Sequence, residues 1–156
     1  MKVTKLIKTL YPAKSVVEAH CDGPCGVYDP ASARIAAEAA LSMTKKLMAL
    51  SHPEHSDEEA SLEYHNTFDR FVAIKEEQAH LAKTEVLVLW TDYFKPVHLE
   101  KYPDLHELVW ETTKLCSAVK HHVDLDAANQ LMANIEKIHN IFWETKGRDV
   151  AWYVAS

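Results

Sequence analysis

Glycine is nearly absent from this chain, and its apolar residues recur every three or four positions over long stretches. Only three glycines and six prolines occur in 156 residues, so few positions favour a turn or a helix end. Spacing of three and four is typical of amphipathic helices, whereas half-buried strands alternate every second residue. The chain is therefore expected to be all-α and built from long helices.

Four stretches carry the helical spacing. We expect helices over residues 30–50, 56–93, 104–121 and 125–145, with a longer loop at 94–103. Asp29 as N-cap and Pro30 at the first helical position are expected to open the first helix, and Ser56 is expected to cap the second. In the first helix, the residues expected to face the core are Ile35, Ala39, Met43 and Leu47. Four such helices with mostly short connections predict an up-down-up-down four-helix bundle.

The charge and hydropathy of the chain exclude two classes of partner. There are 23 acidic residues against 17 lysines and arginines, a formal charge of −6. No basic stripe is therefore available to neutralise the phosphates of a nucleic acid. No apolar run approaches the length of a membrane span. We expect neither nucleic acid nor a membrane as a partner.

The first nineteen residues resemble a signal peptide only superficially. Four lysines are spread through the segment and interrupt the apolar run that an export signal needs. Val17-Glu18-Ala19 is a plausible cleavage site. We interpret residues 1–19 as a propeptide that a protease removes after Ala19, which leaves 20–156 as the mature domain and favours a cytoplasmic location.

The chemistry concentrates in residues 20–28, His-Cys-Asp-Gly-Pro-Cys-Gly-Val-Tyr, which have neither helical nor strand spacing and are expected to form an N-terminal hook. After cleavage, His20 offers an α-amine and an imidazole, Cys21 a backbone nitrogen and a thiolate, and Cys25 a second thiolate. Two nitrogens and two sulfurs can then lie in one plane, with the imidazole in an axial position. Such coordination favours nickel or copper over zinc, which prefers a tetrahedron. These anionic donors also stabilise Ni(III), so a nickel ion could both accept and donate one electron.

Other readings of the metal-binding residue types remain open on spacing alone. A Cys-x3-Cys pair also occurs in half of a zinc site, in a redox pair or without function. Cys116 falls on the apolar stripe of its helix and is expected to be a small buried hydrophobe. Two Glu-x-x-His motifs, at 77–80 and 136–139, match a di-iron bundle. Their helical phase places them largely off the core faces, so we expect solvated surface there.

The full sequence of the hook and of several later segments favours the nickel interpretation over these alternatives. Residues 20–30 resemble the N-terminal hook of nickel-containing superoxide dismutases, which reads His-Cys-Asp-x-Pro-Cys-Gly-Val-Tyr-Asp-Pro, and match it throughout. The likeness continues in residues 33–35, 90–96, 100–106 and 141–146. It therefore covers essentially all of residues 20–147, and the hook motif is highly specific.

The resemblance implies an enzyme that dismutates superoxide to oxygen and hydrogen peroxide. One nickel ion per subunit, cycling between Ni(III) and Ni(II), would be bound by His20, Cys21 and Cys25, and the mature subunits would form a homohexamer. A nickel carrier or sensor with the same hook is the non-enzymatic alternative.

The resemblance also implies roles for four further residues. Asp22 and Tyr28 would lie by the open face of the metal. Tyr93 would be a hydrogen-bonding partner of Tyr28, and Lys95 would help to attract the anionic substrate. The presence of both tyrosines favours catalysis over metal storage.

At two positions the chain departs from the family pattern. The family's glutamate after Arg-Ile and an arginine on the second helix together orient the ligand imidazole. Here these positions are Ala36 and Gln78. The imidazole of His20 is therefore expected to be held by another group: a neighbouring subunit, a water molecule or Gln78 itself.

Overall fold

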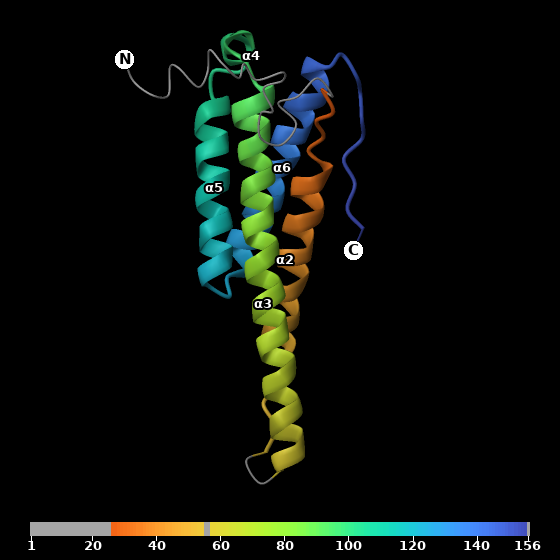
Figure 1. The fold of residues 1–156 in the computed structure, drawn as a ribbon, viewed down its shortest axis with the longest axis vertical. Coiled ribbons are helices and arrows are strands. Elements are labelled where there is room, and N and C mark those ends of the chain that lie inside the picture. The colour runs from red at the N-terminus through yellow and green to blue at the C-terminus, as the bar shows by residue number, and fades with distance from the viewer. Residues whose placement is uncertain (1–25, 55–56, 156) are drawn as a thin grey trace, which may run out of the picture.

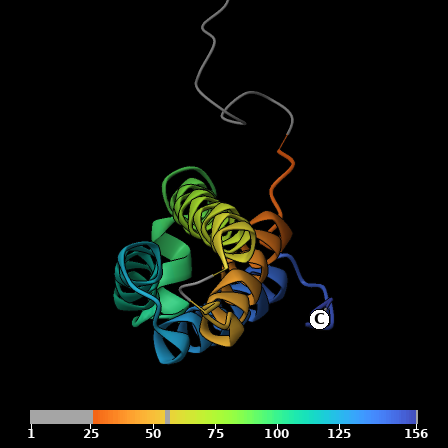
Figure 2. The same ribbon diagram turned by 90° about the horizontal axis from the view of Figure 1, so that it is seen from below.

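The computed structural model describes residues 26–54 and 57–155, and within these ranges it contains helices and no strands. The helices are α2 (Ala31–Ala49), α3 (Glu58–Val88), α4 (Pro96–Lys101), α5 (Leu105–His121) and α6 (Leu125–Thr145), and a π-helical turn, η1 (Leu89–Tyr93), continues α3. Successive long helices run in opposite directions (Figure 1). Seen end-on, they surround one core, with α2 and α5 each lying against both α3 and α6 (Figure 2). The predicted up-down-up-down four-helix bundle is confirmed.

The core is asymmetric in the size of its side chains. On α6 it holds large residues, including Leu131, Ile135 and Phe142, all 0% exposed. On α2 the buried apolar residues are mainly alanines: Ala33, Ala36, Ala37 and Ala40. The predicted core face of this helix is wrong at its first position, because Ile35 is 57% exposed. The buried residues of α3 likewise include two alanines, Ala79 and Ala82, and small side chains on both helices allow close packing.

Several helix ends differ from their predictions. Asp57, rather than Ser56, caps α3, and its carboxylate accepts a hydrogen bond from the Ala60 amide at 2.9 Å; Ser56 lies outside the described residues. Pro30 precedes the first residue of α2 instead of belonging to it. Pro30 thus takes the N-cap position predicted for Asp29, although the Asp29 carboxylate still accepts from the Ala31 amide at 2.8 Å.

The segment between α3 and α5 is more regular than predicted. The predicted loop at 94–103 contains the short helix α4, which begins at Pro96. The last turn of the second predicted helix is the π-helical turn η1, in which the Phe94 amide donates to the Leu89 carbonyl at 3.0 Å. This hydrogen bond spans five residues, so the turn is wider than an α-helical turn.

Two segments extend beyond the four-helix core. The first is the arm (residues 45–54 and 57–74), where α2 and α3 continue past the ends of α5 and α6 (Figure 1). No residue of α3 before Lys75 is buried. The second is the strap (residues 148–155), which follows Gly147 and runs back alongside α2 and α6 (Figure 1). No helix of the described part of the chain is both long and apolar enough to cross a membrane.

Candidate metal centre

The hook meets the described structure at Gly26. The predicted nickel ligands and their neighbour lie outside the described residues: His20, Cys21, Asp22 and Cys25. Gly26 has a φ of 59°, a conformation that glycine adopts without steric cost. The chain therefore turns within the last part of the hook, and Tyr28 then packs, half-buried, against the core.

The donor chemistry of the hook suits nickel. An α-amine, a backbone nitrogen and two thiolates form a planar nitrogen–sulfur set, and soft thiolates with nitrogen donors match nickel or copper. In residues 26–54 and 57–155, no three His, Cys, Asp or Glu side chains come together in a way that could hold a metal ion. What the bundle does contribute beside the hook is a group of aromatic and polar side chains.

Two tyrosines that are distant in sequence meet where the hook joins the bundle. The ring centroids of Tyr28 and Tyr93 are 5.7 Å apart, with planes tilted by 50°. Tyr93 is the last residue of the π-helical turn η1, and single π-turns are frequent at functional sites. The structure thus brings together the rings of the two tyrosines that the family resemblance implies are partners.

The ring of Tyr93 is held by two further helices. Phe142 of α6 lies 4.4 Å away between centroids, and the ring of His98 of α4 stacks on it at 5.6 Å. The ammonium group of Lys146 lies 4.8 Å from the Tyr93 ring centroid, a distance at which a cation is attracted to the aromatic face. We call this region the tyrosine end, composed of Tyr28, Tyr93, Phe94, Lys95, His98, Phe142, Thr145 and Lys146.

The hydroxyl of Tyr93 bonds to a residue that the sequence analysis did not assign a role. Tyr93 Oη lies 2.6 Å from Thr145 Oγ1, and Thr145 Oγ1 donates to the Phe142 carbonyl, also at 2.6 Å. A hydrogen bond between the hydroxyls of Tyr28 and Tyr93 stays a prediction. The three-residue spacing of Phe142 and Thr145 could have suggested the bond within α6, but its pairing with Tyr93 requires the fold.

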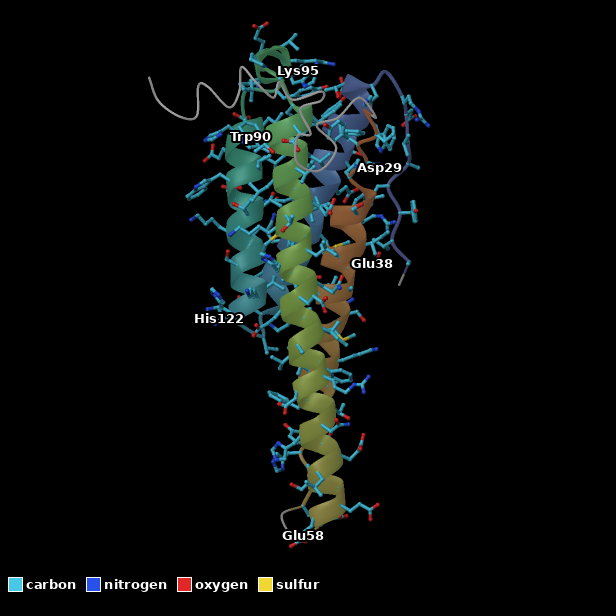
Figure 3. The ribbon with its side chains drawn as sticks, viewed as in Figure 1. Asp29, Glu38, Glu58, Trp90, Lys95 and His122 are labelled. Carbon is cyan, nitrogen blue, oxygen red and sulfur yellow. The ribbon has the colours of Figure 1, made fainter. Side chains whose placement is uncertain are left out.

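Lys95 lies exposed at the start of α4, two residues beyond Tyr93. Figure 3 shows it near Trp90, at the opposite end of the molecule from Glu58. Its backbone amide donates to His98 Nδ1 at 3.1 Å, so that nitrogen carries no proton. Burial lowers the pKa of His98, and the charge of Lys95 lowers it further. The neutral imidazole stacks on Tyr93, while the Lys95 side chain remains on the surface.

The two departures from the family pattern lie in different environments. Ala36 is 1% exposed and belongs to the alanine face of α2, so its position provides no polar group. Gln78 is half-buried on α3 and remains the only one of the two with hydrogen-bonding capacity. Which group holds the His20 imidazole stays a prediction, because His20 lies outside the described residues.

The other metal-binding residue types have ordinary roles. Cys116 is 1% exposed, as predicted, and burial raises its pKa from 9.0 to about 12. Glu77 and His80 lie exposed on α3, as predicted for solvated surface. His139 is buried instead, and its Nε2 bonds to the Val150 carbonyl of the strap at 2.8 Å.

Comparison with known proteins identifies the family. The family model for nickel-containing superoxide dismutase matches residues 15–146. The nickel superoxide dismutases of Streptomyces coelicolor and Streptomyces seoulensis are each 44% identical to this chain over 141 residues, or 90% of this chain and 98% of the relative. A native nickel superoxide dismutase structure superposes with a TM-score of 0.69 at 47% identity and covers 82% of this chain and 99% of its own. The chain belongs to the nickel-containing superoxide dismutase family.

Proposed function

We propose that the mature protein dismutates superoxide at a mononuclear nickel ion bound by the hook. In the overall reaction, two superoxide anions and two protons give one oxygen and one hydrogen peroxide. The observation that carries the proposal is the contact between Tyr28, three residues beyond Cys25, and Tyr93. Through this contact, the last residue of the hook packs against a tyrosine of the bundle.

His20, Cys21 and Cys25 would hold the nickel through the α-amine and imidazole, the backbone nitrogen and thiolate, and the second thiolate. When bound, the ion would supply one-electron chemistry by alternating between Ni(III) and Ni(II). The protein's own residues would then bind the anion, orient it and deliver protons.

The tyrosine end supports these tasks. Tyr28 is the last residue of the hook and would border the open face of the metal together with Asp22. Tyr93 would orient Tyr28 through their contact. Lys95 and Lys146 place two cationic side chains at this end, and such charges raise the local concentration of an anionic substrate. The start of α2, three residues beyond Tyr28, would add the positive end of a helix dipole.

Processing and assembly complete the proposal. Residues 1–19 would be a propeptide, and cleavage after Ala19 would convert the amide nitrogen of His20 into the amine that chelates nickel. The mature subunits would form a homohexamer in which the hook lies at or near a subunit contact, because thiolates exposed to the peroxide product would be oxidised. The spread of lysines in the propeptide supports a cytoplasmic location.

The test compares three chains: the full-length protein, a protein beginning at His20 and a matched control beginning at Ala19. We expect only the protein beginning at His20 to bind one nickel per subunit and to turn over superoxide rapidly. The control retains every side-chain donor but converts the His20 amine into an amide. Normal turnover by the nickel-loaded full-length chain would disprove the role of processing. Stable nickel binding without turnover by the chain beginning at His20 would support the carrier instead.

A further inference from the structure

Tyr93 contacts Tyr28 of the hook, so the direction of its hydroxyl hydrogen determines whether it can donate to or accept from groups near the metal site. Tyr93 Oη lies 2.6 Å from Thr145 Oγ1. Distance alone does not say which oxygen donates, because each hydroxyl carries one hydrogen and can also accept. The answer depends on the second contact of Thr145.

The second contact of Thr145 settles the direction. Its Oγ1 also lies 2.6 Å from the carbonyl oxygen of Phe142. A carbonyl oxygen has no hydrogen and can only accept, so the single hydrogen of Thr145 points to Phe142. Thr145 is then an acceptor toward Tyr93, and the phenolic hydrogen of Tyr93 points to Thr145.

We infer that Thr145 is a positioning residue that makes Tyr93 a hydrogen-bond acceptor on its substrate side. With its hydrogen committed to Thr145, the Tyr93 oxygen can only accept from any further partner. Superoxide has no hydrogen and can only accept, and Tyr93 has no second hydrogen to donate to it. The hydroxyl of Tyr28 and the hydrogen peroxide product can both donate to Tyr93. This inference rests on the proposed function.

The arrangement separates the tasks of the tyrosine end. An anion is attracted by cationic groups, while Tyr93 engages only groups that carry a hydrogen. If Tyr93 were free to rotate, its hydroxyl could also donate to an anion and hold it. Thr145 therefore keeps Tyr93 from binding anions and reserves it for orienting a hydrogen-bond donor.

The test replaces Thr145 and follows the hydrogen-bonding state of Tyr93. Thr145→Val removes the hydroxyl at nearly constant shape, and Thr145→Ser retains it. Thr112→Val is the matched control, because Thr112, like Thr145, lies in a helix and donates to a carbonyl of its own helix, that of Leu108, at 2.6 Å. The tyrosine Fermi doublet in ultraviolet resonance Raman spectra reports whether a phenol donates or accepts. Subtracting the spectrum of Tyr93→Phe isolates the Tyr93 signal, and the measurement uses protein beginning at His20 with and without nickel.

We expect a donor signature for Tyr93 in the parent, in Thr145→Ser and in Thr112→Val, and its loss in Thr145→Val. In the nickel-loaded enzyme, Thr145→Val should also bind the anion azide about two- to tenfold more tightly and lower turnover by a similar factor, as expected for one redirected hydrogen bond. Thr145→Ser should restore most of the turnover and the parent's azide inhibition.

Two results would overturn the inference. A parent spectrum in which Tyr93 is not a donor would refute the direction of the bond. This measurement needs no Thr145 variant, so it remains decisive even if Thr145→Val folds poorly. Unchanged azide inhibition in Thr145→Val, despite a changed spectrum, would refute the positioning role. Failure of the proposed function is distinguishable, because the parent itself would then lack turnover while the spectra of the metal-free protein would remain informative.

Discussion

The tyrosine end and the arm lie at opposite ends of the helix pair α2 and α3, and they differ in how many other elements pack there. At the tyrosine end, side chains of α4 and α6 pack against Tyr93 of η1, and the Tyr93 hydroxyl bonds to Thr145. In the arm, α3 has no buried residue from Glu58 to Ile74, and Leu62 is 73% exposed. Figure 3 shows Lys95 and Glu58 at these two opposite ends. Packing by further helices, rather than helix formation itself, distinguishes the tyrosine end from the arm.

Lys75 marks the boundary between the two regions. It is 2% exposed, and its ammonium group donates to the carbonyls of Val119, Lys120 and His122 at 2.5–3.1 Å. The last carbonyls of a helix have no partner within the helix, and a cation is favourable beside them. Where α5 ends, α3 therefore supplies a charged side chain that satisfies the exposed backbone, and beyond this point α3 continues as the arm.

The largest difference between the two ends is expected in metal binding, because only the tyrosine end adjoins the hook, and removal of the hook thiolates tests it. We expect Cys21→Ser and Cys25→Ser to lose bound nickel and superoxide turnover to background, because a serine hydroxyl stays protonated near neutral pH and is a poor anionic donor. Nickel per subunit and turnover of the protein beginning at His20 would be measured, with thermal unfolding to confirm that the bundle is intact.

Cys116→Ala is the matched control for these variants. Burial raises the pKa of Cys116 to about 12, so the group is a neutral thiol at the pH of the assay and resists alkylation while the protein is folded. Turnover should stay close to that of the parent. A loss as large as that of the hook variants, in a folded protein, would show that the ligand assignment is wrong.

The second prediction concerns the boundary itself. Lys75→Met should lower the free energy of unfolding by roughly 2–4 kcal/mol, because it leaves three carbonyls at the end of α5 without their donor. Turnover per folded subunit should not change, since Lys75 lies far along α3 from Tyr93. Urea unfolding would be compared with that of Lys137→Met, an exposed lysine on α6. Equal free energies of unfolding for the two variants would show that the hydrogen bonds of Lys75 do not stabilise the end of the core.

The bundle could be predicted because helix spacing and punctuation are local signals. The bounds of α6 were predicted as found, from Leu125 to Thr145. The core face of α2 was not, because the rule that large apolar residues turn inward favours Ile35 over the neighbouring alanines. Close packing against α3 instead selects the smallest side chains. Neither α4 nor the π-turn has a sequence pattern as strong as a long amphipathic repeat.

A third prediction tests whether the strap stabilises the α2 side of the core. The strap amide of Ala155 donates to Glu38 Oε1 at 2.6 Å, while Glu38 Oε2 accepts from Arg34 at 3.1 Å, and the Tyr153 ring lies over the Arg34 guanidinium at 4.2 Å. Ending the chain at Gly147 should lower the free energy of unfolding by about 1–3 kcal/mol, since it uncovers this buried ion pair and removes a hydrogen bond to a charged group.

The strap lies beyond the family match, which ends at residue 146, so its loss should leave turnover intact. Thermal unfolding of the shortened chain, against the parent and Tyr153→Leu, would separate the whole strap from its ring contact alone. A shortened chain as stable as the parent would mean that the strap contacts contribute nothing to folding.

The candidate site divides into parts that the sequence could and could not supply. The metal-binding hook could be predicted because its donors all lie within residues 20–25, and chelation by such close donors depends mainly on local connectivity. The meeting of Tyr28 and Tyr93 came from family resemblance, and the structure supports it through their ring contact. Thr145 and Lys146 lie in the stretch 141–146 that resembles the family, but the sequence predicted no role for them. Their contacts with Tyr93 span about fifty residues and depend on how α6 lies against η1.

The smallest effect that we predict uses the distance between the two ends. Cleavage after Ala19 removes four lysines and one glutamate, so the formal charge moves from −6 to −9, and the protein as a whole repels superoxide. Lys95 at the tyrosine end should offset this repulsion locally, whereas Lys45, exposed on α2 in the arm, should not. Lys95→Glu and Lys45→Glu make the same change in net charge at opposite ends.

At about 10 Å in water, a charge reversal alters the energy of an anion by roughly 0.8 kcal/mol, about fourfold in rate. We therefore expect Lys95→Glu to slow turnover about two- to fivefold at low salt, with nickel content unchanged and the deficit fading as salt screens the field. Lys45→Glu should stay near the parent at every salt concentration. If both variants slow turnover equally, only the net charge matters. If neither does, Lys146 or the start of α2 must supply the attracting field.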